Sequence, residues 1–501
     1  MSSAPLPRES LTWRVSWLTF AKTAGFAFSI ALPLLLVRRM DQQAYGVYKQ
    51  AFLVVTTAMT VLPLGVNMSA FYFLAREPGR QRETILNIVL FNLAAGTAAC
   101  GVLFIDPSIL TLIFHSPLLA PYARWIGVTM LLWICGAFLE MAPIANEEIK
   151  LASACIIGIQ ASRALIFVAA AVFFGTVRSL LIAAVLHGVI QTAVLMIYLQ
   201  SRFPGFWRSF NASMLRSQLS YALPLGSAGL LATLQTDLHN YFVSNRFGPA
   251  LFAVYTIGTL QLPLMGLIQE ATNSVLITRV SVLEQRREHR EIVWLLARAA
   301  RKLAAVYFPV YALLLVVGRE FIRFLFTSRY TDAWPIWAVN LTLLPVSIVL
   351  LDPLFRAFES ERYFLLRLRM GLVMALIVTL TLGTRQLGLT GVIGAVVGTA
   401  LLERGVAAIH FGRLLGVGRR DLVLLRDVGK LALASLVAGI VCGSVRLLLL
   451  PAGPLTVLAV CAAVFTGAYL GAVCVLRVNL GLEAAAARVS WARSVIGLRR
   501  A

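Results

Sequence analysis

The chain has 501 residues, of which 59% are hydrophobic and 13% are charged, and its mean hydropathy is +0.84. Soluble domains carry about twice this share of charged residues, so the composition excludes an ordinary soluble protein. The formal net charge of +22 would suit nucleic-acid binding, but that interpretation depends on where the charges lie along the chain.

The apolar residues fall in runs close to the ~20 residues that cross a bilayer as a helix. The first run, 16–37, follows a polar segment, 1–15. It is too long for the apolar core of a signal peptide and lacks a small-residue cleavage site, so we interpret it as a retained first span. In all, about 14 spans are predicted. They are 16–37, 48–73, 84–105, 119–142, 151–174, 178–199, 217–243, 250–276, 302–318, 333–354, 364–384, 388–412, 430–449 and 455–476.

Lys and Arg are distributed unevenly between the two sets of loops. The termini and even-numbered loops carry about three times as many as the odd-numbered loops. Basic residues concentrate on the cytoplasmic side of membranes, so both termini are predicted to be cytoplasmic. The most basic loop, 279–302, then faces anionic lipid headgroups on that side. The net charge therefore reflects topology, and no nucleic-acid partner is expected.

Sequence signals for catalysis or for a cofactor are missing. There is no P-loop motif, and no loop is long enough to fold as a catalytic domain. The six cysteines all fall within predicted spans without CxxC spacing, which favours packing roles over metal or disulfide roles. We therefore expect no catalytic residues, no metal and no cofactor, and the chain is not predicted to be an enzyme.

Three short segments of the first half recur, in the same order, in the second half. The segment 38–50 aligns with 245–257 and places Arg39, Val47 and Tyr48 on Arg246, Val254 and Tyr255. The looser pairs are 145–150 with 357–362, and 174–185 with 387–398.

Each pair joins helices that are six spans apart, so the repeating unit has six spans. An even number returns the chain to its starting side, which predicts two lobes of like orientation, related by a pseudo-two-fold axis along the membrane normal, with a cavity between them. We therefore predict an all-α polytopic membrane protein. Its parts are a cytoplasmic segment 1–15, an N-lobe 16–200, a C-lobe 217–415, two extra helices within 430–476 and a basic cytoplasmic tail 477–501.

Several motifs, in order, resemble those of a known family. Tyr45, Gly46 and Tyr48 form an aromatic-Gly-x-Tyr connector, and Gly65 lies within the second span. Pro224, Asp237 and Gly248 mark the seventh span, and Gly388, Gly391 and Gly394 lie in the region of the eleventh and twelfth spans. Over roughly residues 14–415 the chain resembles polysaccharide and lipid-linked oligosaccharide flippases of the Wzx-like polysaccharide biosynthesis family. These belong to the multidrug/oligosaccharidyl-lipid/polysaccharide exporter superfamily.

The resemblance implies a bacterial inner-membrane transporter with two six-helix bundles. It implies a substrate, an undecaprenyl-pyrophosphate-linked oligosaccharide, that moves from the inner to the outer leaflet by alternating access. The resemblance also implies a role in the export of surface polysaccharides such as exopolysaccharide or O-antigen. A polysaccharide polymerase or chain-length regulator is implied as a partner by the family alone.

Ionisable residues inside spans are costly and are therefore candidate functional residues. Arg163 lies about 18 Å into the fifth span at 1.5 Å per residue, too deep for easy snorkelling, and its guanidinium suits a pyrophosphate. The alternative is a structural pair with a carboxylate or a helix carbonyl. Lys22, Asp237 and Glu270 are the other predicted cavity residues, although each could instead serve topology or structure.

The candidate coupling residues are Asp237, His187 and His239. Asp237 could carry a proton or cation, or close an outer gate, whereas His187 titrates near neutral pH unless burial prevents it. His239 is equally explained as a hydrogen-bonded packing residue. Gly394 and Gly398 form a GxxxG pair, which predicts close helix packing. The alternative function is a cation-coupled multidrug exporter of the same superfamily, although the sequence offers no clean carboxylate cluster for a coupling ion.

Overall fold

The computed structural model describes residues 31–449 and 452–478, and within these residues every regular element is helical. Nine of the described helices are long and apolar enough to cross a membrane, or up to 11 if each of two bent pairs counts as one span. This confirms an all-α polytopic membrane protein. The chain divides by packing into unit 1, residues 1–257, and unit 2, residues 258–501.

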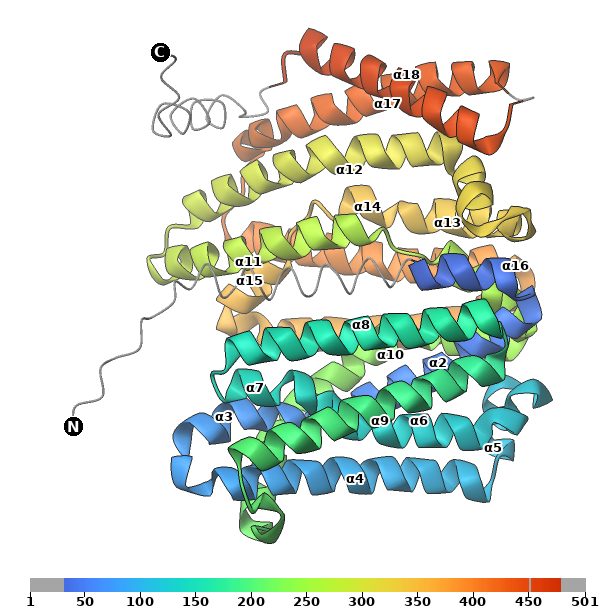
Figure 1. The fold of residues 1–501 in the computed structure, drawn as a ribbon. Coiled ribbons are helices and arrows are strands. Elements are labelled where there is room, and N and C mark those ends of the chain that lie inside the picture. The colour runs from blue at the N-terminus through green and yellow to red at the C-terminus, as the bar shows by residue number, and fades with distance from the viewer. Residues whose placement is uncertain (1–30, 450–451, 479–501) are drawn as a thin grey trace, which may run out of the picture. The chain divides into compact units, whose positions relative to one another are not determined.

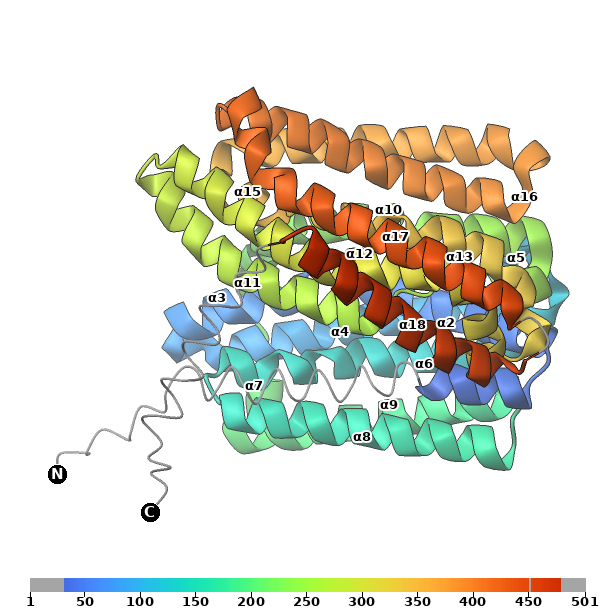
Figure 2. The ribbon, with the colours of Figure 1, turned by 90° about the horizontal axis from the view of Figure 1, so that it is seen from above.

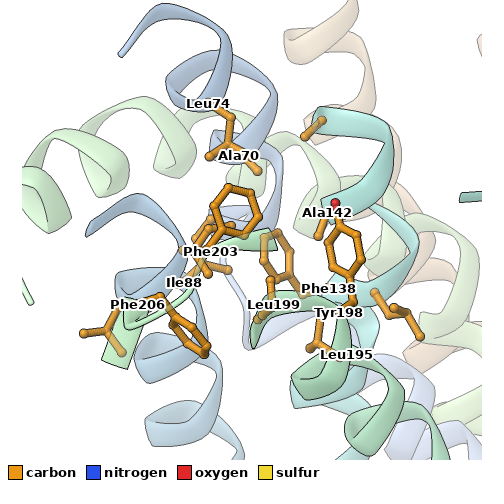
Figure 3. Packing of buried hydrophobic residues seen from close by; sticks show 14 of the residues in the cluster. Ala70, Leu74, Ile88, Phe138, Ala142, Leu195, Tyr198, Leu199, Phe203 and Phe206 are labelled. Carbon is orange, nitrogen blue, oxygen red and sulfur yellow. The ribbon is translucent and has the colours of Figure 1, made fainter. Parts of the chain in front are cut away.

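Unit 1 is a bundle in which α4 packs on α6, α6 on α9, and α8 on α9 (Figure 1). Where the helices converge at one end, large apolar side chains such as Phe138, Tyr198 and Phe203 interlock in a fully buried cluster (Figure 3). The helices are α2 (Gln42–Val61), α3 (Ser69–Arg76), α4 (Gln81–Ile105), α5 (Ser108–Phe114), α6 (Ala123–Gly136), α7 (Ala142–Ala145), α8 (Ile149–Phe173), α9 (Val177–Arg202) and α10 (Ala212–Gly258).

Local sequence signals explain where these helices begin and bend. Asp41 accepts a hydrogen bond from the amide of Ala44 (2.6 Å) and so caps the start of α2. After α2 the chain bends by 47° at Gly65, whose φ of +75° favours glycine. Thr176 and Ser179 form a capping box that starts α9. The predicted second span is therefore a bent pair of helices rather than one continuous helix.

Helix α10 packs along α2 and the turn that follows it. A Cβ placed on Gly46 would lie 1.8 Å from the carbonyl oxygen of Pro249, so the two repeated connectors touch directly. Further along, Gln50 Nε2 donates to Ser244 Oγ (2.7 Å), and a Cβ on Gly226 would lie 2.3 Å from the carbonyl oxygen of Leu64. The predicted seventh span thus packs within unit 1, and the division by packing falls after Ile257 rather than near the end of the sixth span.

Unit 2 holds the remaining helices, and α17 and α18 pack on α12 and on each other (Figure 2). Arg446 of α17 donates from Nη2 to Glu320 of α12 (2.7 Å), and the Tyr469 hydroxyl of α18 donates to the carbonyl oxygen of Ala305 (3.0 Å). The two extra helices are therefore tied to α12. The helices are α11 (Pro263–Gln285), α12 (His289–Phe326), α13 (Trp334–Leu341), α14 (Leu343–Val346), α15 (Asp352–Ala357), α16 (Arg362–Leu414), α17 (Arg426–Leu448) and α18 (Pro454–Val475).

The ninth and tenth predicted spans also differ from the helices of the structure. The ninth, 302–318, lies within the longer α12, because the basic segment before it continues as helix. The tenth, 333–354, is broken into α13, α14 and the start of α15, and prolines lie at the second helical positions of α13 and α15.

Four glycines bear on the predicted repeat and on the predicted close packing of helices. Gly175 ends the α8 region with φ +61°, and its repeat partner Gly388 interrupts α16 with φ +59°. The repeated segments 174–185 and 387–398 therefore each contain a glycine with a similar positive φ at the equivalent position. The prediction of close packing at Gly394 and Gly398 is wrong for the described residues, because a Cβ on either glycine would meet no described heavy atom within 4 Å.

Candidate functional site

Arg163 lies in the middle of α8, ten residues before its end at Phe173. At 1.5 Å per residue that is about 15 Å from the nearer helix end. The residue is half-buried, and its Nε is buried with no hydrogen-bond partner among the described residues. A guanidinium at this depth is costly unless its charge is compensated or used.

Aromatic rings hold the guanidinium in place. Its Cζ lies 4.9 Å from the ring centroid of Trp133 and 5.8 Å from that of Phe167. Phe52 joins both rings edge-on, at 5.8 and 5.7 Å, and Tyr48 packs on Phe52 at 4.7 Å. We call Tyr48, Phe52, Trp133 and Phe167 the aromatic cluster. The cluster comes from α2, α6 and α8, and cation–π attraction offsets part of the cost of burying the charge.

Trp133 is itself fixed by α9. Its Nε1 donates to the carbonyl oxygen of Ala184 (2.9 Å), and its ring meets His187 edge-on at 5.7 Å. His187 is buried, and its Nδ1 has no hydrogen-bond partner among the described residues. The structure thus brings Arg163 and His187 to the same tryptophan. Glu140, which is exposed, interacts electrostatically with Arg163, so the charge also has one acidic neighbour.

Asp237 and His239 lie together on α10 but have different surroundings. The His239 ring is buried, and its Nδ1 hydrogen-bonds to the Tyr255 hydroxyl at 2.9 Å. This contact suits a packing role. The Asp237 carboxylate is half-buried and interacts electrostatically with Tyr241 one turn later. The hydroxyl of Tyr241 donates in turn to the carbonyl oxygen of Leu53 (3.4 Å), so this part of α10 meets α2.

The other two predicted cavity residues have different outcomes. Lys22 lies outside the described residues. Glu270 lies on α11 in unit 2, where its side chain is exposed. The structure therefore brings Arg163 and His187 together within unit 1.

Sequence analysis missed a polar group of residues in unit 2. Arg369 and Glu403 of α16 form an ion pair (3.2 Å), and Asn273 of α11 donates to Asp352 (3.2 Å). Arg404 is half-buried beside them. The sequence could have indicated these residues, because Arg369 and Arg404 are charged and fall within predicted spans. Six members line one cavity, and we call them the unit-2 polar cluster: Gln269, Asn273, Asp352, Arg369, Glu403 and Arg404.

The comparison with family models decides the family. The model for the polysaccharide biosynthesis protein family matches residues 35–335, more than half of the chain. The chain belongs to this family. The match covers the aromatic cluster, Arg163 and the whole of α10. A search of curated proteins found no match.

Solved structures show the same fold in transporters. The lipid II flippase MurJ in an inward closed conformation matches at a TM-score of 0.70 and 13% identity, covering 92% of this chain and 99% of that chain. An inward-facing multidrug resistance MATE family transporter of the MOP superfamily matches at 0.61 and 14%, covering 78% and 94%. A MOP superfamily transporter from Pyrococcus furiosus matches at a TM-score of 0.54 and 14% identity, covering 80% of this chain and 95% of that chain.

Proposed function

We propose that the protein is a flippase, not an enzyme, for undecaprenyl-pyrophosphate-linked oligosaccharide. It moves the repeat unit from the inner to the outer leaflet of the bacterial inner membrane by alternating access, with both termini in the cytoplasm. The family assignment and the transporter fold support the class of activity. The bias of Lys and Arg toward the even-numbered loops supports the orientation.

The observation that carries the proposal is the setting of Arg163. Aromatic faces hold the guanidinium deep in a span, and its buried Nε donor has no protein partner among the described residues. A planar guanidinium with a free donor matches the geometry of phosphate oxygens. An exporter of cations would instead favour acidic groups at this position. Arg163 therefore binds the pyrophosphate during transport.

The other candidates have supporting places in this proposal. Lys22 adds positive charge for the same pyrophosphate, and Glu270 contributes to the cavity from unit 2. Asp237 and His187 are the residues proposed to couple transport to an ion or proton, while His239 supports the α10 backbone through Tyr255. The glycan then passes to a polysaccharide polymerase or chain-length regulator outside the membrane.

The test uses a deletion strain complemented with wild type, Arg163→Ala or Arg178→Ala. Arg178 is an exposed arginine of the same unit and serves as the matched control. We expect Arg163→Ala, at wild-type protein levels, to leave lipid-linked oligosaccharide on the inner side and to abolish surface polysaccharide, while Arg178→Ala restores export. Normal polysaccharide in the deletion strain, together with new sensitivity to cationic dyes, would instead favour a multidrug exporter.

A further inference from the structure

The unit-2 polar cluster encloses a small chamber between α11, α15 and α16. The chamber has a volume of about 190 Å³. A second cavity of about 170 Å³ shares Gln269 and Arg404 with it and adds Asn340 and Ser347. A water molecule takes up about 30 Å³ of liquid, so each cavity has room for several waters, or for one small polar ring in place of them.

The charges in the chamber are balanced. Arg369 pairs with Glu403, and Arg404 lies in electrostatic range of Glu403 and Asp352. Two cations against two carboxylates leave no excess positive charge for a pyrophosphate. The chamber therefore differs in kind from the surroundings of Arg163, where a guanidinium stands among aromatic rings.

The remaining groups are amides. Asn273 uses its Nδ2 for Asp352, but its Oδ1 is buried with no hydrogen-bond partner among the described residues. Gln269 faces both cavities. An orphaned buried acceptor costs about 1–3 kcal/mol, so it is satisfied by whatever fills the chamber. Amides and carboxylates together offer both donors and acceptors, as a hydroxyl group requires of its partners.

We propose that the unit-2 polar cluster binds a sugar residue of the lipid-linked glycan and sets which glycan the protein accepts. This inference rests on the proposed flippase function. Sugar hydroxyls donate to the Asn273 and carboxylate oxygens and accept from the Gln269 amide and the Arg404 guanidinium. The apolar face of the ring packs on Phe355, which also lines the chamber.

The position of the chamber along its helices suits this role. Arg404 lies ten residues before the end of α16 at Leu414, and Asn273 lies twelve residues before the end of α11 at Gln285. Both helix ends face the cytoplasm in the orientation predicted from the basic loops. At 1.5 Å per residue the chamber is about 15–18 Å inside those ends, on the side from which a glycan built in the cytoplasm enters.

The test compares two probes on purified full-length protein in detergent. One is undecaprenyl pyrophosphate, and the other is the undecaprenyl-pyrophosphate-linked glycan extracted from the deletion strain. Thermophoresis gives a Kd for each. We expect wild type to bind the glycan-bearing probe at least about tenfold more tightly, since one or two hydrogen bonds are worth that ratio. Gln269→Leu and Asn273→Leu bring the ratio close to one and leave the Kd of undecaprenyl pyrophosphate unchanged.

Ser274→Leu is the matched control. Ser274 follows Asn273 on α11, is exposed, and donates to the carbonyl oxygen of Glu270 in its own helix (2.8 Å). It retains the wild-type ratio. The side chain of Gln269 lines both cavities and makes no hydrogen bond to the described residues, so Gln269→Leu tests the chamber even where Asn273→Leu fails to fold.

The outcomes separate the two proposals. Equal affinity of wild type for both probes, or an unchanged ratio in a folded Gln269→Leu variant, overturns the sugar site and leaves the flippase standing. Failure of wild type to bind either probe, or a deletion strain without lipid-linked glycan to extract, overturns the proposed function and with it the inference that rests on it.

Discussion

At the scale of single residues, Arg163 is held by rings rather than by a direct ion pair. Trp133 and Phe167 lie within 6 Å of its guanidinium carbon, and such contacts stabilise a cation by about 0.5–2 kcal/mol. An ion pair would occupy the donors that a phosphate needs. The ring contacts leave the buried Nε donor without a partner among the described residues, which is compatible with the proposed contact to a pyrophosphate.

Trp133 is predicted to matter for stability as well as for Arg163. Trp133→Phe removes the hydrogen bond from Nε1 to the carbonyl oxygen of Ala184, so the midpoint of thermal unfolding in detergent should fall by the equivalent of about 1–2 kcal/mol. Trp207→Phe is the control, because Trp207 is 52% exposed and its loss should be nearly neutral. Equal midpoints for the two variants would contradict the role assigned to Trp133.

At the scale of elements, the absence of a side chain at Gly46 lets α2 contact the backbone of Pro249, just after the kink of α10 at Gly248. We predict that Gly46→Ala destabilises the protein by about 3 kcal/mol, because overpacking against a backbone carbonyl cannot be relieved by a rotamer change. The measurement is the yield and unfolding midpoint of purified protein. Gly158→Ala in α8 meets no described atom within 4 Å, so it should be neutral or gain up to about 1 kcal/mol.

The pair Glu320 and Arg446 joins α12 to α17. The Arg446 side chain donates from both Nε and Nη2 to one oxygen of Glu320, and both side chains are largely buried. A double-mutant cycle with Glu320→Gln and Arg446→Met should give a coupling of at least about 1 kcal/mol in unfolding free energy. Arg319→Met, at the exposed neighbour of Glu320, should add to Glu320→Gln without coupling. A coupling near zero would mean that this pair does not help to hold α17 against α12.

The sequence predicted the helices and the place of Arg163 well inside one of them, because both follow from local hydropathy. It supplied Gly175 and Gly388 as a repeat pair, and both adopt a positive φ. It did not supply the contact of Arg163 with Trp133, since thirty residues separate them and an apolar pattern does not say which ring meets which helix. The unit-2 polar cluster was missed for the same reason: its members come from three helices and gather only on folding.

At the scale of the whole molecule, the proposed alternating access requires some helices that are in contact here to separate. We propose that the outer end of α10, in the orientation predicted from the loops, is one such place. Asn245 Nδ2 donates to the carbonyl oxygen of Ile113 (2.7 Å), near the end of α5, and also contacts the ring of His115, which follows α5. These contacts lie within unit 1, close to the packing of Gly46 on Pro249.

We predict that joining these two segments stops transport. A variant with His115→Cys and Asn245→Cys, treated with a short methanethiosulfonate cross-linker, should lose export of surface polysaccharide and accumulate lipid-linked glycan, because α10 cannot leave the α5 connection. Reduction should restore export. Each single variant and the wild type, which has cysteines of its own, receive the same treatment as controls. Continued export by the fully cross-linked protein would show that this contact persists through the transport cycle and that the outer opening forms elsewhere.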